Sequence, residues 1–262
     1  MKRKYIDEHV FDEFSNPESA YWIGFILADG CVLTINNKPM LSVALSVRDV
    51  EHLQKLKTFL KSEHKIQYTT NTCRFRVYAP ILCQALNKYG INSRKSTRES
   101  VPESLKHNRN FWRGVVDGDG WVTYYKNGWG EIGICGSKNV CDGFLSYVQT
   151  IGFTNATVRK HKEANCYKIC VRGYTGSEII CHLYDDSTIY LNRKKIQFEF
   201  TKDAYQQRGR RKGKLTNDEI ADIRKRHQLH QSTRSIAALY AVSWNVVDRI
   251  LKQQTYKYTL IQ

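Results

Sequence analysis

The order of apolar and polar positions predicts two copies of one structural unit along the chain. Apolar residues recur at helical spacing in two pairs of segments, at 49–61 and 139–151 and at about 79–89 and 174–185. Alternating, strand-like runs accompany them, at 65–70, 73–79, 156–162 and 166–172. Each unit is therefore predicted to contain a helix, two strands, a helix, two strands and a final helix.

A matched motif opens each unit. YWIGFILADGCV occupies residues 21–32 and FWRGVVDGDGWV occupies residues 111–122, and each places an aromatic residue before Trp, then a glycine, then a final Asp-Gly. A helix that ends in a turn explains either Asp-Gly pair alone. It does not explain why Asp29 and Asp119, 90 positions apart, are accompanied by matching glycines. We therefore predict an internal duplication.

Small residues predict how the two copies pack. Gly24 and Ala28 are four positions apart, as are Gly114 and Gly118, so each pair lies on one helix face. Small residues on such a face let two helix backbones approach closely. Pseudo-twofold packing then brings Asp29 and Asp119 side by side, where their charges repel. A divalent cation that prefers oxygen ligands, Mg²⁺ or Mn²⁺, relieves this repulsion and can activate water against a phosphodiester.

The composition changes near residue 206. Residues 206–213 are basic and glycine-containing, which is typical of a linker, and residues 214–262 contain three helical patterns. Thr216 with Glu219 forms a predicted capping box, and Ser232 or Thr233, then Ser243, can cap the next two helices. A short helix, a tight turn and an amphipathic helix match a helix-turn-helix unit; a purely structural three-helix bundle is the alternative. The predicted core residues are Ile236, Ala237, Leu239, Val242, Val247, Ile250 and Leu251. The predicted exposed, DNA-binding residues are Trp244, Asn245, Arg249 and Lys252.

These patterns predict an α+β protein with four parts. The first half covers residues 1–98, the second half 99–205, the linker 206–213, and a small all-α domain 214–262.

Charge and composition narrow the partners. A formal net charge of +16 and a pI near 9.5 favour a polyanion, and we predict double-stranded DNA. No apolar run approaches ~20 residues and the N-terminus lacks an apolar signal core, so we expect no membrane span. We expect a soluble intracellular monomer of a bacterial or phage-infected cytoplasm. The eight cysteines form no Cys-x-x-Cys pair, which disfavours zinc and indicates buried free thiols.

The two motifs, WIGFILADG at 22–30 and WRGVVDGDG at 112–120, resemble the nine-position motif of the LAGLIDADG homing endonucleases. The resemblance covers about residues 17–200, in the single-chain form with two motifs. It implies an αββαββα fold in each half, a saddle of two antiparallel sheets on DNA, and Mg²⁺-dependent double-strand cleavage across the minor groove with staggered ends. It also implies that Asp29 and Asp119 bind metal, with the backbone carbonyls of Ala28 and Gly118.

The sequence departs from the family motif in three ways. Leu27 stands where the family has its first acid, while Asp117 keeps an acid at the equivalent position. Trp22 and Trp112 replace the usual leucine. Ile23 and Arg113 replace a small residue, which predicts an unusual helix interface.

Other site residues follow from the offset of 90 and from strand alternation. The resemblance also implies Lys, Arg or polar side chains around the metal and the scissile phosphates. By the offset of 90, the candidates are Lys65 opposite Asn155, and Arg48 with Asp49 opposite Lys138 with Asn139; a cation there would stabilise developing charge or contact phosphate only. The predicted base-recognising residues on the strands are Arg74, Arg76, Arg159, His161, Lys168 and Arg172, with Cys170 on the same face. The predicted phosphate contacts in the two closing basic phrases are Arg94, Lys95, Arg193 and Lys194.

The leading interpretation is a site-specific DNA endonuclease. A catalytically silent regulator or an intron RNA maturase on the same fold is the alternative, although two repelling carboxylates are unnecessary in a protein that only binds. An embedded nuclease of an intein is disfavoured, because the sequence has no nucleophiles placed for splicing. A plain helix-turn-helix repressor is disfavoured because it leaves the first ~200 residues without a role.

Overall fold

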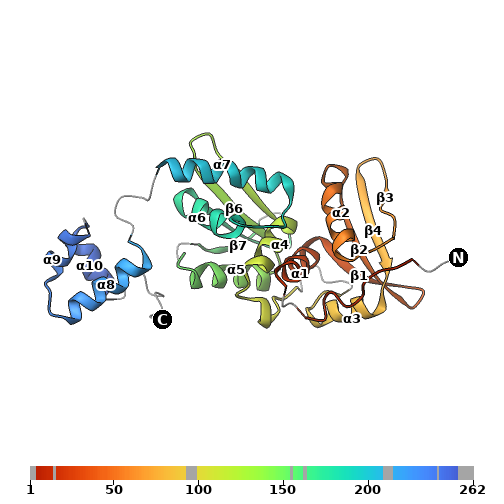
Figure 1. Ribbon diagram of the computed structural model, residues 1–262, viewed down its shortest axis with the longest axis horizontal. Coiled ribbons are helices and arrows are strands. Elements are labelled where there is room, and N and C mark those ends of the chain that lie inside the picture. The colour runs from red at the N-terminus through yellow and green to blue at the C-terminus, as the bar shows by residue number, and fades with distance from the viewer. Residues whose placement is uncertain are drawn as a thin grey trace.

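The computed structural model describes residues 4–13, 16–92, 99–153, 156–161, 164–208, 215–240 and 242–252. It contains the predicted unit twice (Figure 1). The first unit comprises α1 (Pro17–Asp29), β1 (Gly30–Ile35), β2 (Lys38–Ser46), α2 (Val50–Phe59), β3 (Gln67–Tyr68), β4 (Thr72–Tyr78) and α3 (Pro80–Lys88). The second comprises α4 (Arg109–Asp119), β5 (Gly120–Tyr124), β6 (Gly130–Gly136), α5 (Lys138–Thr150), β7 (Val158–Lys160), β8 (Tyr167–Arg172) and α6 (Gly173–Tyr184), and α7 (Asn192–Arg208) follows. The predicted αββαββα order is confirmed.

Each unit forms one antiparallel sheet with the same strand order, β1-β2-β4-β3 in the first and β5-β6-β8-β7 in the second. One face of each sheet is apolar and buried, with Val43 and Phe75 paired in the first and Ile134 and Ile169 paired in the second. Because side chains alternate along a strand, the intervening residues form the opposite, open face. That open face carries the predicted strand-borne cations Arg74, Arg76, Lys168 and Arg172.

The two hairpins differ in length. Asn36 and Asn37 form a two-residue turn with positive φ between β1 and β2, whereas residues 125–129 connect β5 to β6. Gly30 consequently pairs with Val43, and Gly120 pairs with Ile134. The offset between equivalent positions is therefore 91 in β2 and β6, and the assumed offset of 90 is wrong by one residue there.

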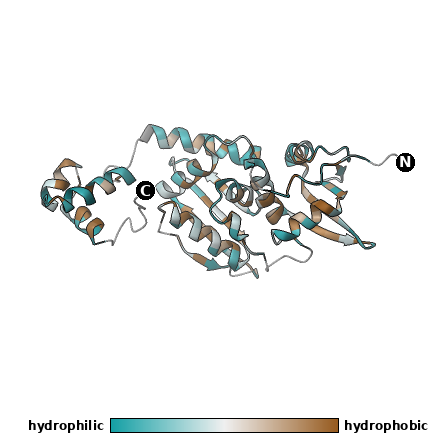
Figure 2. Ribbon diagram, turned by 60° about the horizontal axis from the view of Figure 1, so that its bottom comes forward, coloured by the Kyte–Doolittle hydropathy of each residue, from teal (hydrophilic) through white to brown (hydrophobic). Residues whose placement is uncertain are grey.

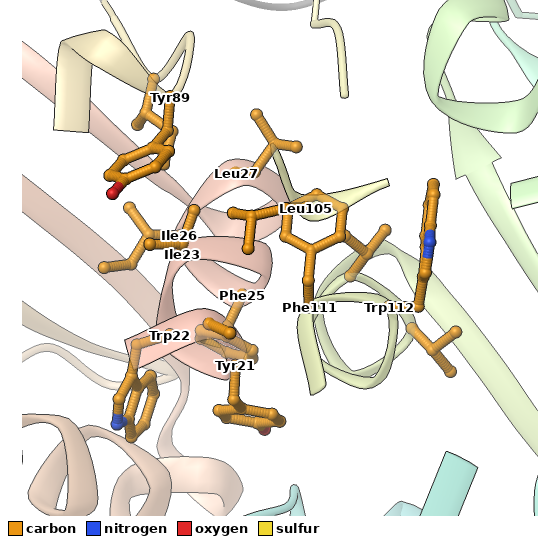
Figure 3. Close-up of a cluster of buried hydrophobic side chains, with 14 of the residues drawn as sticks. Tyr21, Trp22, Ile23, Phe25, Ile26, Leu27, Tyr89, Leu105, Phe111 and Trp112 are labelled. Carbon is orange, nitrogen blue, oxygen red and sulfur yellow. The ribbon is translucent and has the colours of Figure 1, made fainter. Parts of the chain in front are cut away.

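The central helices α1 and α4 pack against each other between the two sheets (Figure 1). Asn16 and Asn108 cap them, each accepting hydrogen bonds from two backbone amides of the first turn. Residues 19–27 of α1 and 111–117 of α4 are buried, and large apolar side chains from each helix surround the interface (Figure 3). Arg113, which stands where the family motif has a small residue, is 2% exposed and donates to the carbonyls of Ile189 and Leu183. The helix pair is thus a fixed platform that ends at Asp29 and Asp119.

Three further helices follow α7: α8 (Asn217–Gln228), α9 (Thr233–Leu239) and α10 (Trp244–Leu251). They bury their own apolar cluster, and each carries hydrophilic residues as well as hydrophobic ones (Figure 2). The capping box of Thr216 and Glu219 is present. Leu239, predicted in the core, is 61% exposed, because the short α9 turns only Ile236 and Ala237 inward. No helix in the described ranges is long and apolar enough to cross a membrane.

Candidate active site

Glycines set the distance between α1 and α4. A Cβ atom added to Gly24 would lie 2.1 Å from the Phe111 carbonyl oxygen, and one added to Gly114 would lie 2.1 Å from the Tyr21 carbonyl oxygen. Both distances are far below van der Waals contact, so the backbones touch where the sequence has no side chain. The predicted close packing of the two small-residue faces is confirmed.

The last turns of the two helices are equally close. A Cβ atom on Gly118 would lie 2.3 Å from the Cβ atom of Ala28 and 3.4 Å from the backbone nitrogen of Asp29. Gly118 precedes Asp119, so the two aspartates end neighbouring helix turns, and both are exposed. After each aspartate, Gly30 or Gly120 returns its N–H to the helix and begins the first strand of a sheet. Two carboxylates therefore stand at the junction of both halves.

Lys194 lies beneath this pair of carboxylates. It is 1% exposed, and its Nζ donates to the carbonyl oxygens of Val116 at 2.5 Å, Asp117 at 2.7 Å and Gly120 at 2.7 Å. Two of these carbonyls belong to the last turn of α4 and the third belongs to its C-cap residue, where a cation is favourable. Burial lowers the pKa of Lys194 to about 8, and the nearby charge of Asp117 opposes this effect, followed by those of Asp29 and Asp119.

Lys194 is therefore not a phosphate contact, and that prediction is wrong. The closing basic phrase begins α7, and the first turn of α7 inserts Lys194 against the end of α4. The basic residue next to it, Arg193, stays 44% exposed and pairs with Asp49 at 3.2 Å.

Asp117 organises a buried network around the same helix end. Its side chain is inaccessible to solvent and accepts hydrogen bonds from Tyr21 at 2.7 Å, Tyr184 at 2.5 Å and the Leu191 backbone at 2.8 Å. Burial raises the pKa of Asp117, while Lys194 and the tyrosine hydroxyls act to lower it. Because Tyr21 belongs to α1, Asp117 also connects the two halves.

His52 extends this network into the first half. Its Nε2 lies 3.0 Å from the Tyr21 hydroxyl, whose own hydrogen goes to Asp117, so His52 is the donor. Burial lowers the pKa of His52 to about 3. The imidazole is therefore neutral near pH 7. Neither His52 nor the two tyrosines were predicted from the sequence.

Two other catalytic candidates, Arg48 and Lys138, contact acids other than Asp29 and Asp119. Arg48 is exposed and faces Asp49 at 3.8 Å, and Lys138 pairs with Asp142 at 2.5 Å at the start of α5. Lys65 is exposed between α2 and β3. Asn155, Arg94 and Lys95 lie outside the described residues.

Comparison with solved structures identifies the architecture. The chain is similar to I-SmaMI bound to an uncleaved DNA target with calcium ions, with a TM-score of 0.52 and 15% identity over 74% of this chain and 92% of that chain. It is similar to the LAGLIDADG meganuclease I-AabMI bound to uncleaved DNA, with a TM-score of 0.52 and 14% identity over 74% and 91%. It is also similar to the LAGLIDADG homing endonuclease I-GzeII in complex with its DNA target, with a TM-score of 0.53 and 12% identity over 93% and 99%.

The fold is that of the LAGLIDADG homing endonucleases. At the level of sequence, no protein-family model matches the chain, and no curated protein matches it either. Identities of 12 to 15% establish the architecture alone, and the chemistry of the site depends on the residues of this chain.

The open faces of the two sheets carry the strand-borne cations. Arg74 and Arg76 share the open face of β4, opposite the buried Cys73, Phe75 and Val77. In the second sheet, Arg159 of β7 pairs in register with Lys168 of β8. His161 follows the end of β7, and its backbone N–H donates to the Cys166 carbonyl oxygen. The predicted sharing of faces is confirmed for Arg74 with Arg76 and for Lys168 with Arg172, whereas contact with DNA stays a prediction.

The open face of the second sheet also contains a carboxylate that the sequence analysis missed. Glu131 of β6 is 5% exposed and accepts hydrogen bonds from Trp121 Nε1 at 2.7 Å and the Tyr125 hydroxyl at 2.7 Å. It also forms an ion pair with Arg172, its register partner on β8. Arg172 therefore has a fixed acidic partner, unlike Arg159 and Lys168, which form no ion pair with any described residue.

The donor set at the helix ends fits a hard divalent cation. Two aspartates and the adjacent backbone carbonyls offer only oxygen donors. Within the described residues, no larger metal-binding cluster, of three or more His, Cys, Asp or Glu side chains, is found. Mg²⁺ typically keeps several waters and uses one or two protein carboxylates together with substrate phosphate oxygens. A site with Asp29 and Asp119 as its acidic ligands has this composition.

Proposed function

We propose that this chain is a site-specific DNA endonuclease that makes a metal-dependent, staggered double-strand cut in a long DNA target. The observation that carries the proposal is the placement of Asp29 and Asp119. Close packing at Gly24, Gly114 and Gly118 brings two carboxylates together midway between two sheets with basic open faces. A protein that only binds DNA gains nothing from two acids at the centre of a DNA-facing surface.

Asp29 and Asp119 would hold Mg²⁺, with the carbonyls of Ala28 and Gly118 as further oxygen donors. When bound, the cation supplies an activated water and stabilises the leaving oxygen of an in-line phosphodiester displacement. The protein's own contribution is geometric and electrostatic. Lys194 fixes the end of α4 through three carbonyls and places a buried positive charge under the two carboxylates. That charge favours the accumulation of negative charge from the scissile phosphate.

The two sheets would position the duplex. Arg74 and Arg76 in the first half, and Arg159, Lys168 and Arg172 in the second, present donors to base edges or phosphates. The three-helix unit after α7 would lengthen the footprint through Trp244, Asn245, Arg249 and Lys252, which are exposed on α10 or directly after it. Tethering such a unit adds affinity without changing the chemistry.

The test starts from source DNA that lacks the gene for this chain. The protein is incubated with this DNA in Mg²⁺ or in EDTA, and the ends formed are sequenced. Discrete Mg²⁺-dependent staggered cuts at one locus are expected. Asp29→Asn and Asp119→Asn should abolish cutting and retain binding, and Asp203→Asn, an exposed acid on α7, serves as the matched control. Full cutting by either active-site variant refutes the metal assignment, and binding to DNA or intron RNA without any cut favours the regulator or maturase.

A further inference from the structure

Arg172 differs from the other cations on the second sheet because its position is fixed. Its side chain is 72% exposed, yet its Nε is paired with Glu131, whose side chain is 6% exposed. The carboxylate is held in turn by Trp121 and Tyr125. Four groups from β5, the loop after it, β6 and β8 thus form one connected unit on the open face.

Their mutual contact favours the charged forms of both Glu131 and Arg172. Burial acts to raise the pKa of Glu131, but hydrogen bonds from Tyr125 and Trp121 and the contact with Arg172 outweigh it, and the pKa falls below its usual value. The same contact raises the pKa of Arg172. A carboxylate with its oxygens engaged is a rigid support for a guanidinium, and such support reduces the entropy lost when the guanidinium binds.

The geometry also defines what Arg172 can bind. Its contact with Glu131 uses Nε, and the guanidinium carries two further nitrogens whose donors match the paired acceptors O6 and N7 of guanine in the major groove. A shallow hollow of about 420 Å³ adjoins Arg172 and is lined by Tyr125, Asn127, Trp129 and Gly173. This hollow provides room for a base edge next to the arginine.

We propose that Glu131 is a positioning residue for Arg172 and that the pair specifies guanine at one base pair of the target, a conclusion that rests on the proposed function. This base pair lies away from the base pairs next to Asp29 and Asp119. Glu131 pairs in register with Thr123, four residues after Asp119, and four strand residues cover roughly 13 Å.

The first half has no equivalent of this pair. Val43 and Ile134 occupy matching register positions, so Glu131 corresponds to Met40 and Arg172 corresponds to Tyr78. Neither Met40 nor Tyr78 has a forked donor. The proposed pair therefore has no counterpart at the pseudo-symmetric position of the other half-site, and that position is an internal control.

The experiment uses the full chain and the target found by mapping its cuts. Each base pair of the target is replaced in turn by the other three, and binding of every duplex is measured in EDTA. The unaltered protein should prefer guanine by roughly 5- to 150-fold at one position of the second half-site. Arg172→Ala and Arg172→Lys should both lose that preference, because lysine keeps the charge and lacks the fork.

Glu131→Gln separates positioning from folding. It should reduce the preference at the same base pair while affinity for the substituted duplexes is unchanged or higher, since a negative charge leaves a DNA-binding face. Arg159→Ala, an exposed cation without an ion pair to a described residue, should leave the preference at that base pair intact. Specific binding with an unchanged profile in Arg172→Lys, or a uniform loss of affinity in Glu131→Gln, overturns this inference alone. Absence of any sequence-specific binding by the unaltered protein overturns the proposed function as well.

Discussion

Gly114→Ala tests the packing that brings the two aspartates together. The added methyl group would lie 2.1 Å from the Tyr21 carbonyl oxygen and 2.8 Å from the Phe25 backbone nitrogen. Both are backbone atoms, so no side chain can rotate away, and the helices must separate by roughly 1 Å to reach ordinary contact. Overpacking of this kind costs about 1–3 kcal/mol, against a gain of about 1 kcal/mol from replacing glycine inside a helix.

The expected net loss is up to about 2 kcal/mol, which lowers the melting temperature by up to roughly 8 °C for a unit of this size. Activity should fall further than stability, because a shift of about 1 Å at the reacting groups can cost about 100-fold in rate. Cleavage is measured well below the melting temperature with the mapped target, and binding is measured in parallel.

Gly136→Ala is the matched control for this variant. An added Cβ atom at Gly136 meets nothing within 4 Å, so stability and cleavage should both be retained. If Gly114→Ala melts at a higher temperature than the unaltered protein and cleaves at the same rate, the helices are not held by close contact. The argument that small residues place Asp29 next to Asp119 then fails.

Three further predictions concern the tail, pH and oxidation. Removing residues 209–262 should shorten the footprint and reduce the dependence of binding on salt while cutting persists; an unchanged footprint contradicts DNA binding by the tail. Burial lowers the pKa of His52 to about 3 and that of His182 to about 4, so the unfolded state binds more protons below pH 6.5 and stability falls as pH falls. Each should cost about 2 kcal/mol by pH 5, measured by denaturant unfolding, and His52→Gln should lose less than the unaltered protein does between pH 7 and 5. The Sγ atoms of Cys135 and Cys166 are 3.1 Å apart, so mild oxidation should join these two residues in mass spectra of non-reduced peptides; absence of that peptide refutes their proximity.

The parts of the site predicted from the sequence rest on local patterns. The motif helices, their small-residue faces and the αββαββα order follow from spacings within a few turns or strands, and the structure confirms them. The same is true of the cap at Thr216, where a residue and its partner are three positions apart. Such features depend on periodicity, which a single sequence displays directly.

The parts that failed depend on contacts between distant segments. Lys194 looks like any other cation in a basic phrase, and only the packing of α7 on α4 shows that it is buried. Glu131 lies in a short strand with no polar neighbour in sequence, and its partners come from positions up to 41 residues away. The offset of 91 in β2 and β6 required strand register, because hairpin length is not visible from the matched motifs.

The two halves are alike at the positions where the helix backbones touch, and they differ in the chemistry of several equivalent side chains. Gly24 and Gly114 serve the same steric role from opposite helices, and the aspartates that end those helices are equivalent. In contrast, Leu27 is an apolar core residue, while its counterpart Asp117 accepts three buried hydrogen bonds and connects α1 to the segment before α7. A single chain permits this divergence, because each half can change without altering its copy. For the proposed endonuclease, it follows that the cleavage geometry is nearly twofold while the recognised base sequence is not.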